Sequence, residues 1–205
     1  MFKKLIICAM VVMSFFAMKA ATANAYYLGP IPVANGSFAT GDFTGWTISG
    51  NTGATSWYFV NNDGLSLSPA APSATYAQFG STGFPTFISQ NLSTTPGQLY
   101  SVSFWVANDA PASMGFNQFL VLWNGTIEAP SIENGNAFDW TRYTYTAMAT
   151  GTSTPISFSF QNEASVFDFT KVTAAAVPLP AALWFFGSGL IGLAGLRKRM
   201  QTSKR

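Results

Sequence analysis

The chain has 205 residues, of which 9% are charged and 16% are aromatic, and it contains no histidine. The absence of histidine excludes a Ser-His-Asp triad and a histidine metal site. Eight of the ten basic residues lie in the first 25 residues or after Leu196, whereas all eight acidic residues lie between Asp42 and Asp168. The middle of the chain, with two cations and eight carboxylates, is therefore acidic and offers no basic surface to nucleic-acid phosphates.

Residues 1–25 have the pattern of a secretory signal peptide, in which a basic start precedes a short apolar run. Ala23 and Ala25 match an A-x-A cleavage site, so the mature chain is expected to begin at Tyr26. A retained membrane helix is the alternative, although the run is short and ends in small residues. Because Cys8, the only cysteine, lies in this segment, the mature chain is expected to have no disulfide and no thiolate metal site.

Residues 26–173 are predicted to form one all-β domain, a β-sandwich. Tyr100–Val106 and Ile156–Gln161 alternate apolar and polar side chains, which is typical of strands with one buried face. Phe119–Trp123 is a more continuous apolar run, and the Asn-Gly pair that follows it is a strong hairpin signal. Arg142–Ala149 is expected to begin a second hairpin. Weaker strands are expected at 74–80 and 166–173, and short strands at this spacing favour a sandwich.

The aromatic residues divide into expected core residues and expected surface residues. Three tryptophans lie within strand-like patterns and are expected in the core: Trp46, Trp105 and Trp123. Exposed aromatic rings stack on sugar rings, and three aromatic residues near loops rich in Asn and Asp are candidates for glycan binding: Trp57, Tyr58 and Trp140. Two further residues have comparable surroundings: Phe84 and Phe116.

Catalysis has little support in the residues present. Two carboxylates are sufficient in principle for glycoside hydrolysis. The candidates lie in polar, loop-like stretches, where solvated surface carboxylates are the better interpretation: Glu128, Glu133, Asp139 and Glu163. We therefore expect no enzymatic activity.

The last part of the chain is predicted to be a membrane segment. Residues 174–177 are expected to be a linker, and no charge occurs from Val177 to Leu196. A helix over 180–196 spans about 25 Å, which nearly crosses a hydrocarbon core. The basic end, 197–205, is expected on the cytoplasmic side. A buried core helix is the alternative, but the basic residues after the apolar run have no place in a core.

Residues 177–205 resemble the PEP-CTERM sorting signal of Gram-negative bacteria in its VPLPA variant. A motif, a helix and a basic end occur in the required order. The motif residues are Val177, Pro178, Leu179, Pro180 and Ala181, and the basic stop is Arg197, Lys198 and Arg199. Leu179 stands where the commoner form has Glu. The resemblance implies export through the Sec pathway, an intermediate anchored in the inner membrane, and processing by an exosortase before transfer to the cell surface.

A second resemblance covers most of residues 33–173. NGSFATGDFTGW, FISQNLSTTPGQLYSVSFWVAND and FLVLWNGT follow one another, as in the jelly-roll domains that precede PEP-CTERM tails. The pattern is also similar to carbohydrate-binding modules of the galactose-binding-like type. Such modules often hold a structural calcium ion through a Glu after NGSF and paired Asp residues in the last strand. Ala39 replaces that Glu and only Asp168 remains, so Asp168 is a weak calcium candidate and no cofactor is expected.

Taken with the jelly-roll fold, these resemblances predict an exported, non-enzymatic surface or extracellular-matrix protein associated with extracellular polysaccharide, biofilm or floc. The alternative is a carbohydrate-binding module that recognises a glycan through exposed aromatic residues. A glycoside hydrolase is a distant third interpretation.

Overall fold

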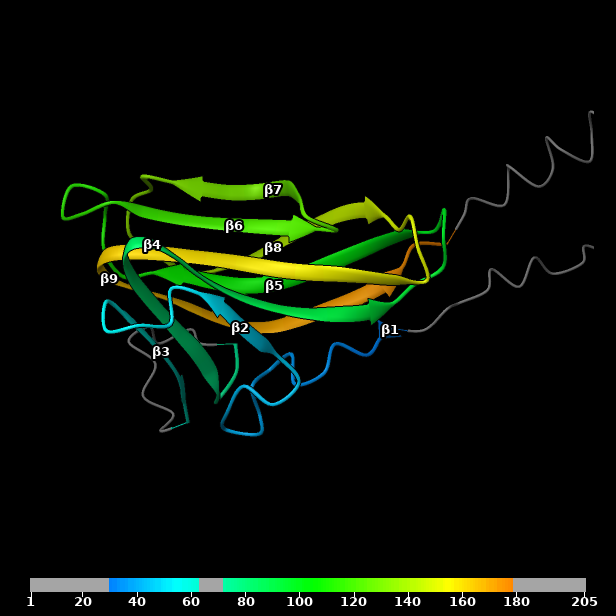
Figure 1. Ribbon diagram of the computed structural model, residues 1–205, viewed down its shortest axis with the longest axis horizontal. Helices are drawn as coiled ribbons and strands as arrows, with labels where there is room; N and C mark the ends of the chain where they lie inside the picture. Colours follow the sequence, from blue (N-terminus) through cyan, green and yellow to red (C-terminus); the bar gives the residue numbers. More distant parts are fainter. Residues whose placement is uncertain (1–29, 63–71, 179–205) are drawn as a thin grey trace, which may run out of the picture. The chain divides into compact units, whose positions relative to one another are not determined.

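The structure is a computed structural model that describes residues 30–62 and 72–178. Within these ranges all regular structure is β, and no helix long enough to cross a membrane occurs there. The predicted signal segment, the predicted C-terminal helix and its basic end lie outside the described residues. The strands are, in chain order (Figure 1), β1 (Pro30–Ile31), β2 (Thr47–Gly50), β3 (Ser56–Asn61), β4 (Tyr76–Ser93), β5 (Leu99–Asn108), β6 (Asn117–Trp123), β7 (Thr126–Glu133), β8 (Phe138–Met148) and β9 (Ser153–Ala176).

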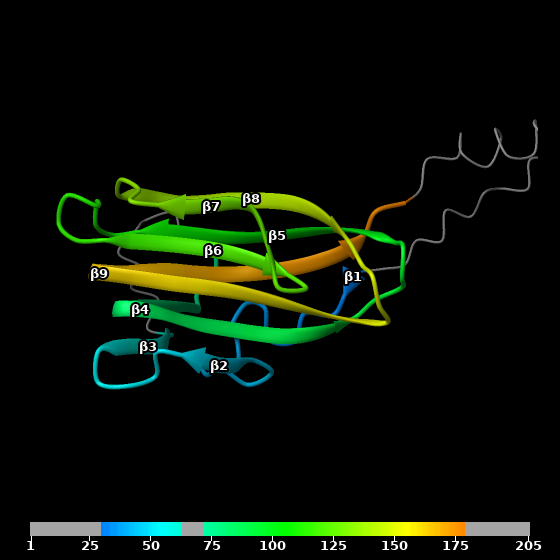
Figure 2. The same cartoon turned by 45° about the horizontal axis from the view of Figure 1, so that its top comes forward.

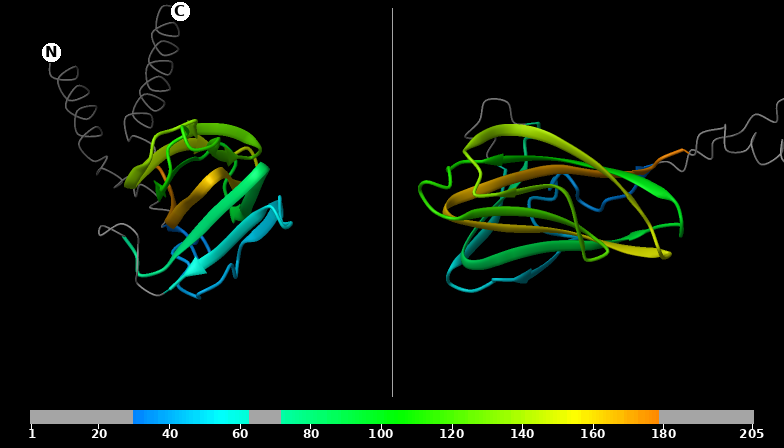
Figure 3. Two further views of the ribbon diagram at one scale, coloured as in Figure 1. Left: turned by 90° about the vertical axis from the view of Figure 1, so that its left-hand side faces the viewer. Right: turned by 90° about the horizontal axis from the view of Figure 1, so that it is seen from above.

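Strand β9 belongs to both layers of the fold. Its first half pairs with the later part of β4 on one edge and with β6 on the other. Its second half pairs with the early part of β4 and with β5. Figure 3 shows these halves as a yellow and an orange strip that run in opposite directions. Strand β4 also passes between layers, and its register with β9 shifts between Phe79 and Thr86.

Two antiparallel sheets result, joined through β4 and β9. Sheet I has the order β2-β4-β9-β6-β7, and sheet II has the order β3-β4-β9-β5-β8. The short β1 pairs with the end of β9 in sheet II. The edge strands β7 and β8 lie close together on one side of the molecule (Figure 2). The arrangement is a jelly-roll β-sandwich, which confirms the all-β prediction.

Aromatic side chains fill the space between the sheets, because every second residue of a strand points inward. Phe104 of sheet II contacts Phe119 and Phe158 of sheet I, with ring centroids 5.5 and 5.3 Å apart. All three are fully buried, and each such side chain contributes about 1.5–3 kcal/mol. The predicted inward faces of β5 and β9 are confirmed: Tyr100, Val102, Phe104 and Val106 are buried, as are Ile156, Phe158 and Phe160.

The predicted hairpin between β6 and β7 is also confirmed. Asn124 and Gly125 connect the paired residues Trp123 and Thr126. Both turn residues have positive φ, 51° and 78°. A type I′ turn needs this conformation at both positions, and Asn-Gly adopts it readily.

The segment predicted as a linker, 174–177, begins instead with the end of β9. Ala174 and Ala175 pair with both β5 and β1, and Ala176 pairs with β5. Val177 continues the contact, because its N–H donates to Leu99 O at 2.8 Å and its carbonyl accepts from Gln98 Nε2 at 2.7 Å. Ala174 lies in the main core and Ala176 packs against it, although a run of small side chains resembles a linker in the sequence.

Candidate functional site

Two rows of side chains cross the outer face of sheet II, the face that points away from the core. Alternation along each strand and the register between strands place them side by side. The first row contains Phe59, Gln78, Asp168 and Ala107. The second row contains Asn61, Tyr76, Thr170, Trp105 and Arg142. This outer face, defined by the two rows with Trp57 and Trp140, is the candidate site.

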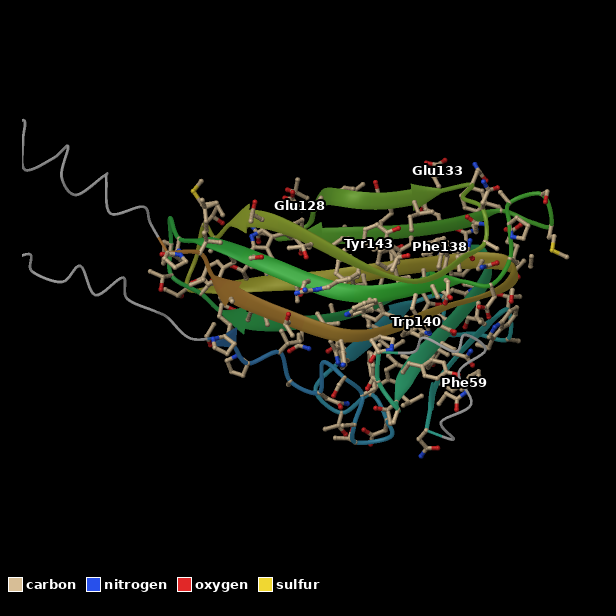
Figure 4. All side chains as sticks on the ribbon, turned by 180° about the vertical axis from the view of Figure 1, so that it is seen from behind. Phe59, Glu128, Glu133, Phe138, Trp140 and Tyr143 are labelled. Atoms are coloured by element: carbon tan, nitrogen blue, oxygen red, sulfur yellow. The ribbon has the colours of Figure 1, made fainter. Side chains whose placement is uncertain are left out.

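Tyr76 of β4 and Trp140 of β8 meet although β9 and β5 lie between their strands. Their rings are edge to face, with centroids 5.6 Å apart. Both side chains therefore lean across the outer face, where they pack with Ala107 and the half-buried Trp105. Figure 4 shows Trp140 on this face, with Phe59 nearer the β3 edge. Trp140 is consequently only 7% exposed and is a wall of the site, not the exposed ring that we expected.

Asp168 lies in the middle of this face and is 1% exposed. Its Oδ1 accepts a hydrogen bond from Gln78 Nε2 at 2.7 Å, whereas its Oδ2 receives none from any residue that the structure describes. Burial and the nearby Asp109 carboxylate raise the pKa of Asp168 to about 7, although the Gln78 hydrogen bond opposes the change. The site therefore has a buried carboxyl group whose charged form is poorly compensated.

Asp109 is the second carboxyl group of the site and follows the end of β5. It stands two residues beyond Ala107, which is paired with Asp168. Burial raises the pKa of Asp109, and its buried Oδ2 also receives no hydrogen bond from the described chain. Arg142, the cation of the second row, donates instead to Ser103 Oγ at 3.1 Å.

Trp57 forms an exposed aromatic surface at the β3 edge. It is paired with Gly80, and a Cβ atom at position 80 would collide with three atoms of the indole. The ring therefore lies across the bare glycine backbone, while 40% of the side chain is exposed. Phe59, two residues along the same strand face, is 47% exposed. Together they provide an apolar strip beside the polar pair of Gln78 and Asp168.

Tyr58 is on the opposite side of β3 from Trp57, because adjacent residues of a strand point to opposite faces. Its ring contacts Phe43, with centroids 6.0 Å apart, and it packs on the main core. Tyr58, a predicted glycan-binding residue, is therefore not on the same face as Trp57 and packs on the core. The binding role of Trp57 stays a prediction.

Sequence reasoning placed Trp105 in the core and did not single out Tyr76, Gln78 or Asp109. Trp46 and Trp123 are in the main core as expected, but Trp105 packs on the outer face. The pattern of β5 contained the signal, since Trp105 alternates with the inward Phe104 and Val106. Asp109 had no comparable signal, because a carboxylate after a strand is usually solvated.

The remaining candidates are distributed over other parts of the surface. Phe84 is 56% exposed at the bend of β4, and Phe116 is half-buried before β6. Glu128 and Glu133 lie on β7 in sheet I (Figure 4). Glu163 accepts from Gly83 N at 3.2 Å. The acidic residues proposed as surface groups are half-buried or exposed: Glu128, Glu133, Asp139 and Glu163.

The opening loop is organised by hydrogen bonds within the protein. Asp42 Oδ1 accepts from Thr40 Oγ1 at 2.7 Å and from Thr44 N at 2.9 Å, which lowers the pKa of Asp42. Asp168 bonds Gln78 and makes no hydrogen bond to this loop in the described structure. Within the described ranges no three metal-ligating side chains gather. Calcium binding at Asp168 stays a prediction.

No family model and no curated protein matches the chain. Several solved structures are similar to it at low sequence identity. The carbohydrate-binding module TmCBM61, in complex with β-1,4-galactotriose, is 18% identical with a TM-score of 0.54, over 73% of this chain and 100% of that chain. The CBM22-1 xylan-binding domain of Paenibacillus barcinonensis Xyn10C is 14% identical with a TM-score of 0.50, over 75% of this chain and 96% of that chain.

The enzymatically active domain of tailspike protein 4 from bacteriophage CBA120 is 17% identical with a TM-score of 0.52. The match covers 75% of this chain but only 22% of that chain. At these identities the likeness shows the fold alone. The chain has the jelly-roll β-sandwich that is also the fold of carbohydrate-binding modules.

Proposed function

We propose that this chain binds a glycan without chemically altering it, and that the outer face of sheet II is the binding surface. The observation that carries the proposal is Trp57, whose indole lies across Gly80 and remains open to solvent beside Phe59. Aromatic faces of this kind stack on the apolar faces of sugar rings. The shared fold with carbohydrate-binding modules supports the same interpretation.

The polar groups of the face complement its aromatic strip. Arg142 is exposed at one end of the second row, and a guanidinium group donates hydrogen bonds to sugar hydroxyls. The middle of the face is buried at Gln78, Asp168 and Thr170, so the surface open to a sugar chain is the strip of Trp57 and Phe59 at the β3 edge.

The test is affinity gel electrophoresis of the full chain in soluble galactan and in xylan, followed by a wider glycan panel. Trp57→Ala and Phe59→Ala are each expected to weaken retention by about tenfold, because each removes one stacking surface. Phe84→Ala is the matched control, since Phe84 is a comparably exposed ring that belongs to neither row and lies at the bend of β4. Equal retention of the Trp57 and Phe84 variants would contradict the location of the site, and no retention by any glycan would contradict the function.

We also propose that the sandwich acts outside the cell, as an exosortase-processed surface or matrix protein that associates with extracellular polysaccharide. The order of motif, apolar run and basic end in residues 177–205 supports the sorting step. The pattern of residues 1–25 supports export. An acidic, glycan-binding sandwich suits such a matrix role without catalysis.

A further inference from the structure

Among the residues that the structure describes, no cation pairs with the two carboxyl groups of the outer face. The only influence that lowers the pKa of Asp168 is the Gln78 hydrogen bond, and none lowers that of Asp109. Both groups have a buried Oδ2 that receives no hydrogen bond from the described residues. Buried carboxylates are ordinarily paired or hydrogen-bonded, because desolvation of an unpaired charge is costly. Two neighbouring acceptors without donors therefore indicate a missing donor.

An aromatic cluster packs on the same outer face, beside the residue paired with Asp168. Tyr76 and Trp140 meet across the face and pack on Ala107, the residue paired with Asp168, while Trp105 borders the same cluster. Rings of this kind attract a cation through their quadrupole, and the attraction increases where water is excluded. Carboxylates together with aromatic walls are the chemistry that recognises an organic ammonium group.

We propose that the glycan recognised by this face carries protonated amines, as in a de-N-acetylated hexosamine polymer, and that Asp109 and Asp168 bind the ammonium group beside Trp105, Trp140 and Tyr76. This inference rests on the glycan-binding function proposed above. An ammonium group is compact and has three donors, which are the groups that the two carboxyl groups lack. An N-acetyl group has no charge and only one N–H donor.

Asp109 is the more exposed of the two residues, because it is half-buried whereas Asp168 is covered. The described sandwich has seven carboxylates and only two cations, Arg142 and Lys171. Its overall charge therefore attracts a cationic glycan and repels uronate or sulfated polymers. The Oδ2 atoms of Asp109 and Asp168 add a specific contact with the ammonium group to this general electrostatic attraction.

The experiment compares binding of the full chain to a glucosamine hexamer and to an N-acetylglucosamine hexamer by isothermal titration calorimetry. The amine form is expected to bind about tenfold more tightly, because its cation gains the carboxylate and ring contacts. Asp168→Asn and Asp109→Asn are expected to bring this ratio close to one. Glu133→Gln is the matched control, since it removes one negative charge from an exposed residue of sheet I.

Each outcome separates the inference from the function on which it rests. A ratio near one in the unaltered chain, or an equal loss of selectivity in Glu133→Gln, overturns the inference. Binding of neutral galactan or xylan with no preference for the amine also overturns it, while the glycan-binding function stands. If Asp168→Asn fails to fold by circular dichroism, the half-buried Asp109→Asn decides the result. No binding of any glycan overturns the proposed function itself.

Discussion

Gly80 and Trp57 face each other across β4 and β3, and the indole occupies the space that any side chain at position 80 would fill. The absence of a side chain on one strand thus sets the orientation of a ring on the next. Gly80 is therefore a positioning residue of the proposed binding surface, although it presents no functional group to a ligand.

Gly80→Ala is expected to displace the Trp57 ring and to weaken glycan retention by about tenfold, the effect of losing one stacking surface. Intrinsic tryptophan fluorescence should report a change in the environment of the ring. Gly53→Ala is the control, because an added Cβ there meets only Asn51 Oδ1 at 3.8 Å. Unchanged retention by Gly80→Ala, with the fold intact, would show that the orientation of Trp57 is irrelevant to binding.

The stability of the chain is expected to fall as the pH rises from about 4 to 7. Burial and Asp109 raise the pKa of Asp168 to about 7 in the folded state, against about 3.9 in an unfolded chain. The folded state thus holds a proton that the unfolded state releases, so the contribution is complete below about pH 4 and is lost as the pH rises through about 7.

Urea unfolding midpoints measured from pH 4 to pH 8 test this dependence. Asp168→Asn should flatten the decline, because the amide does not titrate, whereas Glu133→Gln should leave it in place. A decline of the same steepness in the Asp168→Asn variant would assign the pH dependence to another group.

The end of β9 is expected to contribute to stability although it resembles a linker. A chain that ends at Thr173 lacks the pairing of 174–176 with β5 and the hydrogen bonds of Val177 to Gln98 and Leu99. Its melting temperature should be several degrees lower than that of a chain that ends at Pro178, since each lost hydrogen bond costs about 0.5–1.5 kcal/mol. Identical thermal melts would mean that these alanines pair without stabilising the sandwich.

The sorting proposal predicts two masses for the protein. Where the processing enzyme is present, the surface form should begin near Tyr26 and end near the motif at 177–181. Where the enzyme is absent, the form in the inner membrane should retain Trp184 and the basic end. Detection of Trp184 in the surface form by mass spectrometry would disprove the cleavage. The processed form should also focus below pH 7, because both basic segments have been removed.

The strands of the core could be predicted because their inward positions alternate without interruption. Phe104 and Phe158 each stand in such a pattern, Phe119 begins a continuous apolar run, and Asn124 with Gly125 specifies the turn that follows it. The passage of β4 and β9 between layers could not be predicted. The two halves of each strand have similar alternation, and the separation depends on register shifts set by partners distant in the sequence.

The outer face was the least predictable part of the molecule. Tyr76 and Trp140 come from strands that are separated by two others, and only the leaning of both side chains brings them together. Asp168 was identified for calcium from a family pattern, and its proximity to Asp109 follows from the pairing of β9 with β5. Such relationships depend on tertiary register and leave no periodic signal in the chain.

The position of β9 determines how the sandwich responds to mechanical load. A pull on the chain at Val177, directed along β9, acts on a strand with hydrogen-bonded neighbours on both edges. The backbone hydrogen bonds on both sides of β9 are then loaded together in shear. In an edge strand that is pulled away sideways, by contrast, such bonds break one after another. Because the same strand continues into sheet I, the force is distributed to both layers. A force applied at the C-terminal end of the sandwich therefore acts first on β9, the strand with the most extensive pairing.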